Sequence, residues 1–160
     1  MAQALLTPLH EDDYLTSEIL ADVRHKFVNG GVYAMASASE NHNCISGNLY
    51  SRLLIGGNQD CRSFMGDMML RLNSGMLFTI PMSCWFTMPA TTKHIFKTSP
   101  CMVVEVLSNS IELTDRREKW AAYQKLQSLR EYVLLALDRA YIEVCQRVNL
   151  RYWGMTVPGP

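Results

Sequence analysis

The chain has 160 residues, 48% of them hydrophobic, which is enough for one globular domain with a sizeable core and too little for two ordinary domains. Fifteen basic residues balance fifteen acidic ones, so no overall positive field indicates a nucleic-acid or membrane partner, and any basic surface has to be local. The five cysteines are odd in number and form no CxxC pair, which argues against a disulfide framework and against a structural zinc site.

The amino-terminal residues carry no positive segment followed by a long apolar run. No stretch of the chain approaches the ~20 consecutive apolar residues of a membrane helix. We therefore expect a soluble cytoplasmic protein whose thiols are reduced.

The first half of the chain predicts a hairpin and a helix. After a short helix or loop near residues 11–20, Asn29-Gly30 separates two β-prone runs, the strongest short signal for a hairpin. Ser39 is an expected helix N-cap, and Gly56-Gly57 is expected to end that helix. Between them the apolar residues recur at helical spacing, which predicts an amphipathic helix lying on a sheet; they are Ile45, Leu49, Leu53 and Leu54.

The second half predicts strands, a helix and a second hairpin. Apolar segments at 64–72, 76–86 and 102–107 indicate three strands. Thr114 or Asp115 is expected to cap the next helix, in which Trp120, Tyr123 and Leu126 recur every three residues. Residues 131–137 and 141–148 predict a hairpin. The order of elements predicts an α/β (α+β) domain with a central mixed sheet.

One acid stands alone in the most apolar of these strands. Glu105 is flanked by valines and other apolar residues, and an ionised carboxylate buried there is costly unless it is paired, hydrogen-bonded or bound to a metal. We therefore expect Glu105 to have a specific partner. A neighbouring arginine or lysine is the ordinary alternative to a metal.

Several separated motifs occur in one order along the chain: residues 31–36 (GVYAMA), 40–43 (ENHN) with 47–49 (GNL), 104–108 (VEVLS), 115–119 (DRREK) and 130–133 (REYV). Together they resemble the Uma2 family, nucleases abundant in cyanobacteria and similar to restriction endonucleases of the PD-(D/E)XK superfamily. The likeness spans about residues 12 to 148, and it is specific because several motifs occur together. It implies a restriction-endonuclease-like mixed sheet flanked by helices in a single domain, 1–160, whose C-terminus is shorter than the family's.

The resemblance also implies an activity, a Mg²⁺-dependent DNA endonuclease. Its core is an Asp after a Pro on one strand, a Glu on the next strand, and a Lys. Carboxylate oxygens hold Mg²⁺, which polarises the phosphodiester and acidifies a water, while the lysine stabilises charge nearby. Glu105 matches the family's Glu, as a catalytic residue and metal ligand.

Lys119 is the candidate for the catalytic lysine. In the wider superfamily the lysine comes two residues after the Glu, but Leu107 stands there. Asp115 lies one helical turn before Lys119, so both are expected on one helix face, which could point at Glu105. An ordinary helix start, with a capping Asp and a solvated Lys, is an equal alternative.

The chain departs from the family at position 82. Met82 follows Pro81, and a thioether does not serve as a hard oxygen ligand for Mg²⁺. The literal chain therefore lacks the metal-binding Asp. Two alternatives to an active nuclease follow: a catalytically inactive relative that binds DNA or a protein partner, and a plain interaction domain in which Glu105 is only salt-bridged.

A shifted reading frame offers an explanation for Met82. Residues 78–86 can be encoded by TTTACTATCCCGATGTCATGCTGGTTT, and one T added after the first codon makes this string read FYYPDVMLV, the strand expected in the family. We hypothesise that residues 79–95 are a frame-shifted segment.

Other polar residues have weaker signals. His42 is expected to be hydrogen-bonded locally in the first turn of its helix rather than to belong to a site, and Asp67 to face solvent. Arg116, Arg117, Lys125 and Arg130 could form a phosphate-attracting patch, although a solvated helix face is the commoner outcome. A strand edge near the C-terminal hairpin makes a homodimer an expected assembly.

Overall fold

The computed structural model describes residues 8–35, 38–57, 61–66, 68–72, 77–79, 81, 83–87, 95–107 and 112–158, with side chains except at 61, 83–87 and 112–116. The first elements are α1 (Glu11–Ile19), β1 (His25–Val28), β2 (Gly31–Ala34) and α2 (Glu40–Gly56). The middle of the chain forms β3 (Cys61–Met65), β4 (Met69–Arg71), β5 (Leu77–Thr79), β6 (Ser83–Thr87), β7 (Phe96–Lys97) and β8 (Met102–Leu107). The last elements are α3 (Glu112–Tyr123), β9 (Glu131–Ala136), β10 (Ile142–Arg147) and β11 (Trp153–Thr156).

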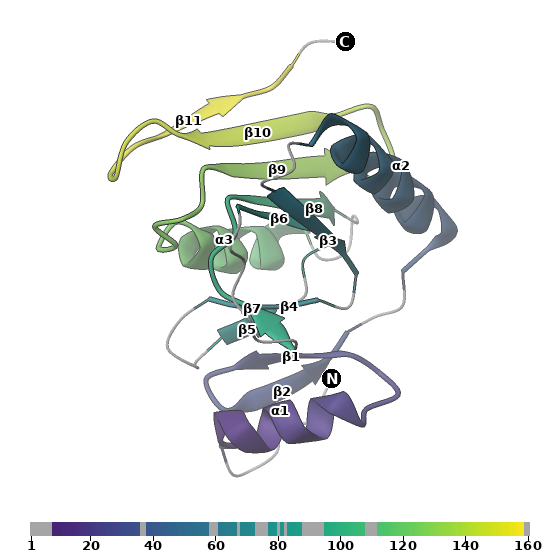
Figure 1. Ribbon diagram of the computed structural model, residues 1–160, viewed down its shortest axis with the longest axis vertical. Coiled ribbons are helices and arrows are strands. Elements are labelled where there is room, and N and C mark those ends of the chain that lie inside the picture. Colours follow the sequence, from purple (N-terminus) through teal and green to yellow (C-terminus); the bar gives the residue numbers. More distant parts are fainter. Residues whose placement is uncertain are drawn as a thin grey trace.

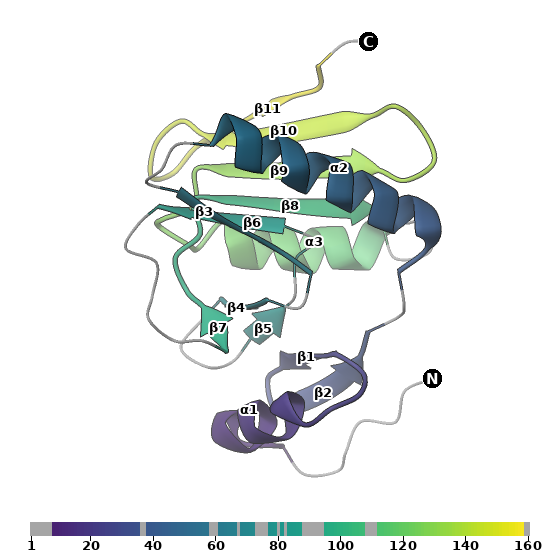
Figure 2. The same ribbon diagram turned by 45° about the vertical axis from the view of Figure 1, so that its right-hand side comes forward.

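The strands form two mixed sheets. The larger sheet has the order β11-β10-β9-β8-β6-β3, and the smaller one has the order β2-β1-β5-β4-β7. In the larger sheet β8 and β9 are parallel, and the other neighbours are antiparallel. α2 covers one face of the larger sheet and α3 lies against the other face, on the side of the smaller sheet (Figures 1 and 2). The predicted mixed α+β class is confirmed.

The first hairpin and α2 form where the sequence predicts them. Asn29 (φ 49°) and Gly30 (φ 86°) take the left-handed conformation that a two-residue turn between antiparallel strands requires. The Ser39 side chain accepts a hydrogen bond from the His42 backbone N–H at 3.3 Å, which is the N-cap interaction. α2 then runs to Gly56.

Two of the predicted strands are each divided between the two sheets. Segment 64–72 contains the end of β3, in the larger sheet, and β4, in the smaller sheet; segment 76–86 contains β5 and part of β6 in the same way. Gly66 (φ 59°) follows β3, and Pro81, which has no N–H for a sheet ladder, separates β5 from β6. An apolar run alone does not reveal such a crossing.

The expected N-cap of α3 is wrong. The helix begins at Glu112, so Thr114 and Asp115 lie inside its first turn. Acidic residues are favoured both as N-caps and within the first turn, where they complement the helix dipole, so the local sequence signal is the same for both positions.

The main core lies between α3 and the larger sheet, and β4 completes it. Tyr123 and Leu126 are buried there, as their spacing predicts, against Val103, Tyr132 and Leu134. A second cluster under α1 is built around Tyr14, Phe27 and Phe78, whose rings lie 4.9–6.1 Å apart. Packing of α3 on the sheet turns its inner face towards β8, where Glu105 lies.

Within the described part of the chain, none of the helices combines the length and apolar character needed to cross a membrane. Cys44, Cys101 and Cys145 form no disulfide among the described residues.

Candidate active site

Glu105 is a buried carboxylate near the middle of the larger sheet. It lies on β8 and is only 7% exposed. Its neighbour across the ladder is Leu134 of β9, which belongs to the core beneath α3. Because paired residues of adjacent strands point to one face of a sheet, the side chain of Glu105 faces α3.

Two residues of α3 each contact one oxygen of this carboxylate. Lys119 Nζ lies 3.1 Å from Glu105 Oε2, and the two side chains are 17% and 9% exposed. The hydroxyl of Tyr123 donates a hydrogen bond to Glu105 Oε1 at 2.8 Å. Lys119 and Tyr123 are four residues apart and therefore share one helix face. The structure thus brings together Glu105 and Lys119, and the partner of the acid is this lysine rather than an arginine.

Tyr123 is the hydrogen-bond donor to Glu105. Its side chain is fully buried, and burial, followed by the negative charge of Glu105, raises the pKa of its phenol well above 10.0. Thr79 of β5 also hydrogen-bonds this phenol, an interaction that works against the rise in pKa. The carboxylate of Glu105 is therefore linked through Tyr123 to the smaller sheet.

The described residues do not by themselves make a Mg²⁺ site. Among them, no three His, Cys, Asp or Glu side chains come together, whereas Mg²⁺ requires several hard oxygen ligands. Glu105 offers one carboxylate, already paired with Lys119. Met82 and the side chain of Asp115 lie outside the described residues. Ser83, the residue after Met82, pairs with Val104, directly before Glu105.

A second buried carboxylate, Glu143, was not singled out in the sequence. It lies on β10, is 2% exposed, and accepts a hydrogen bond from the Tyr141 hydroxyl at 3.2 Å. Glu143 and Glu105 both pair with Leu134, from opposite sides. Two strand spacings, about 10 Å, therefore separate their backbones, and Leu134 lies between them. The signal that could have found Glu143 is the one that identified Glu105, an acid between apolar residues.

The remaining candidates lie elsewhere. His42 is in the first turn of α2, on the other face of the sheet from α3 (Figure 2), and its backbone N–H makes the expected local hydrogen bond. Arg117, Lys125 and Arg130 are exposed. Asp67 and the side chain of Arg116 lie outside the described residues.

Comparison with known proteins gives concordant findings. The Uma2 family, described as "Putative restriction endonuclease", matches residues 11–158. The chain is 32% identical over 149 residues to the uncharacterised protein slr1290 of Synechocystis sp. (strain ATCC 27184 / PCC 6803 / Kazusa), which covers 91% of this chain and 77% of the relative. It is also 32% identical over 150 residues to sll1609 of the same organism, which covers 90% and 84% of the two chains.

A solved structure shares the fold. It is the crystal structure of a "putative nuclease" from Anabaena variabilis ATCC 29413, with a TM-score of 0.71 over 96% of this chain and 90% of that chain. The two sequences are 16% identical, so this likeness is one of fold.

Proposed function

Because this chain belongs to the Uma2 family, we propose that it derives from a DNA endonuclease whose reaction depends on Mg²⁺. In this chain the metal site is incomplete, because Met82 replaces a carboxylate. The observation that carries the proposal is the buried pair of Glu105 and Lys119, 3.1 Å apart. Glutamate and lysine are the two residue types that the resemblance implies for catalysis, and Lys119 on α3 is the candidate for the lysine.

The proposed roles follow from the contacts of each side chain. Glu105 provides the carboxylate, and the hydrogen bond from Tyr123 fixes its orientation. Lys119 holds the other oxygen of the carboxylate with a long, flexible side chain that can move away from it. An ammonium group at this position is suited to stabilise negative charge on a phosphate that approaches Glu105.

Position 82 is where the second carboxylate is needed. Hard divalent cations bind through several oxygen ligands, whereas a methionine sulfur suits soft metals. Ser83, the residue that follows position 82, pairs with Val104, the residue that precedes Glu105. We therefore propose that Met82→Asp completes the carboxylate pair.

Cleavage of supercoiled plasmid DNA in Mg²⁺ or Mn²⁺ tests this proposal. We expect the chain as it stands to cleave no faster than its Glu105→Gln variant. Met82→Asp should gain activity, and addition of Glu105→Gln or Lys119→Met to it should abolish the gain. Met82→Asn is the matched control, because it has the same size and no charge. If Met82→Asp is no more active than Met82→Asn, the proposed site is wrong.

The second candidate function is that of a catalytically inactive relative that binds DNA or a protein partner. Met82 is the observation that favours it. This candidate predicts that the chain binds duplex DNA, or a protein, with no cleavage in any metal, and that Met82→Asp restores nothing.

We include a homodimer in the proposal. β11 is an edge strand that pairs only with β10 within the described sheet. Met155 and Val157, on and beside β11, are 63% and 50% exposed, and exposed apolar strand edges pair readily with another chain. Light scattering at increasing concentration should reveal a dimer, and a monomer mass throughout would contradict it.

A further inference from the structure

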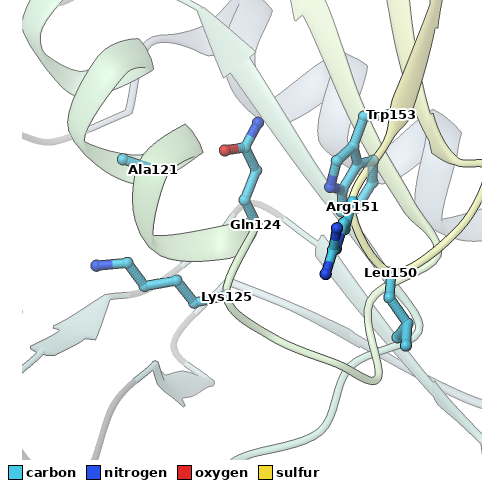
Figure 3. A pocket seen from close by; sticks show the side chains of 6 residues that line it. All are labelled: Ala121, Gln124, Lys125, Leu150, Arg151 and Trp153. Atoms are coloured by element: carbon cyan, nitrogen blue, oxygen red, sulfur yellow. The ribbon is translucent and has the colours of Figure 1, made fainter.

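A shallow open pocket of about 390 Å³ lies away from Glu105, between the end of α3 and the segment that joins β10 to β11 (Figure 3). Gln124 and Lys125 directly follow the end of the helix, and Arg151 and Trp153 form the opposite wall. Ala121 and Leu150 complete the lining. Among these described residues are two cations, an amide and an indole, and no acid.

Four cations lie in or around the pocket. Lys125, Arg151 and Arg130 are exposed. Arg147 lies behind the pocket, with its guanidinium 4.4 Å from the centroid of the Trp153 ring. Burial, followed by the positive charge of Arg130, lowers the pKa of Arg147. Four cations gathered at one end of α3, in a chain of zero formal net charge, make a local surface that favours an anion.

The walls of the pocket are rigid. The guanidinium of Arg147 donates hydrogen bonds to the carbonyls of Gln124, Leu126 and Leu129 at 2.8–2.9 Å, which ties the end of α3 to β10. Trp153 is held between Arg147 and the ring of Trp120, whose centroid is 5.1 Å away. A preorganised surface loses little conformational entropy when a ligand binds.

The opposite wall is also fixed. Asn149 Oδ1 accepts hydrogen bonds from the backbone N–H groups of Arg151 and Tyr152 at 2.9 and 3.0 Å. This interaction fixes the turn before β11 and therefore the position of the Arg151 backbone.

The geometry points to a phosphate-binding surface for DNA: we propose that Lys125, Arg151 and Gln124 bind the backbone of the duplex whose cleavage site is at Glu105. This inference rests on the proposed function. Lys119 lies one turn before the end of α3, and Lys125 follows two residues after the helix ends at Tyr123. The pocket therefore lies near the end of α3 that carries Lys119.

The contacts are of the kind that position DNA without reading its sequence. Lysine and arginine at an exposed rim neutralise phosphates, and the resulting affinity depends steeply on salt. Removal of two such contacts should weaken binding for all sequences alike and should lower the salt dependence.

The test compares two charge-matched double variants. Lys125→Gln/Arg151→Gln removes the two positive charges that line the pocket. Arg52→Gln/Arg139→Gln removes two exposed cations elsewhere, on α2 and between β9 and β10. Fluorescence anisotropy with a labelled DNA duplex, in EDTA and over a range of KCl, measures affinity without requiring cleavage. We expect the pocket variant to bind roughly tenfold more weakly, with a salt slope smaller by about 2, and the control variant to bind close to wild type.

Each other outcome overturns a specific claim. If wild type binds DNA and the pocket variant binds equally well, the pocket inference is wrong and the proposed function stands. If both double variants lose affinity equally, the effect is one of net charge, and the pocket inference is again wrong. If wild type binds no duplex under any condition, the DNA endonuclease proposal fails together with the inference.

Discussion

Replacement of Lys119 by methionine tests how strongly Glu105 depends on its partner. Methionine keeps the length of the side chain and removes the ammonium, so that the 3.1 Å contact with Glu105 Oε2 is lost. The carboxylate then keeps only the hydrogen bond from Tyr123 among the partners described here. Because Glu105 is 9% exposed and Lys119 is 17% exposed in their side chains, solvent compensates little for the loss.

The expected cost is large. Removal of one partner of a buried ion pair typically destabilises a protein by about 3–5 kcal/mol, and the remaining hydrogen bond from Tyr123 places Lys119→Met near the lower limit, at about 3 kcal/mol. In a chain of this size that loss lowers the melting temperature by about 6–12 °C. Glu105→Gln should cost less, about 1–2 kcal/mol, because the longer, more exposed Lys119 can reach water.

A double-mutant cycle measured by urea unfolding at neutral pH separates the pair from its surroundings. Lys119→Met/Glu105→Gln should be more stable than Lys119→Met alone, since the double variant buries no charge. A Lys119→Met variant destabilised by less than about 0.5 kcal/mol, as for an exposed pair, with additive effects in the double variant, would show that Glu105 does not depend on Lys119.

Three further predictions concern other features of the chain. Burial raises the pKa of Tyr123 and of Tyr14, so the native protein keeps phenol protons that the unfolded chain releases above pH 10. The contribution of these tyrosines to the free energy of unfolding should therefore be fully present below pH 10. It should fall as pH rises, by up to about 1.4 kcal/mol per pH unit for each tyrosine. Tyr123→Phe should flatten this slope in urea titrations at alkaline pH, and an unchanged slope would contradict the assignment. Arg147→Met should destabilise the fold by about 2 kcal/mol, because the carbonyls that follow α3 lose a charged hydrogen-bond donor. A change within about 0.5 kcal/mol in the free energy of unfolding, measured by chemical denaturation, would show that Arg147 does not secure the helix end. The codons of residues 79–95, read one base out of frame, should spell a Pro-Asp strand, and any other reading ends the frame-shift hypothesis.

Several features of the site could be predicted from local sequence. A single acid among valines indicates a buried carboxylate with a specific partner, and the three-residue spacing of Tyr123 and its apolar neighbours indicates the inner face of a helix. For Lys119 the sequence left this face and a solvated position as equal alternatives. The hairpin at Asn29-Gly30 and the cap at Ser39 follow from backbone preferences that act over a few residues. In these places local chemistry and global packing agree, so the sequence is informative.

Other features depend on contacts between distant segments. The sequence of an apolar strand does not indicate which sheet the strand joins, so the division of segments 64–72 and 76–86 between two sheets was not predictable from periodicity. The hydrogen bond from Tyr123 to Glu105 was not predicted either, because a tyrosine at a core position of a helix is expected to contribute only to packing. Glu143 was missed although its sequence pattern resembles that of Glu105. The pocket beside Trp153 arises only when the end of α3 meets the turn before β11.

Calorimetric titration of Mn²⁺ tests most directly the claim that Glu105 is a metal-binding carboxylate deprived of its partner at position 82. The proteins are wild type, Met82→Asp, Met82→Asn and Met82→Asp/Glu105→Gln, and the titration requires neither DNA nor catalysis. We expect weak or undetectable binding by wild type and Met82→Asn, one bound Mn²⁺ in Met82→Asp, and loss of that binding when Glu105→Gln is added. Equal binding by Met82→Asp with and without Glu105, or no gain from Met82→Asp, would contradict this claim.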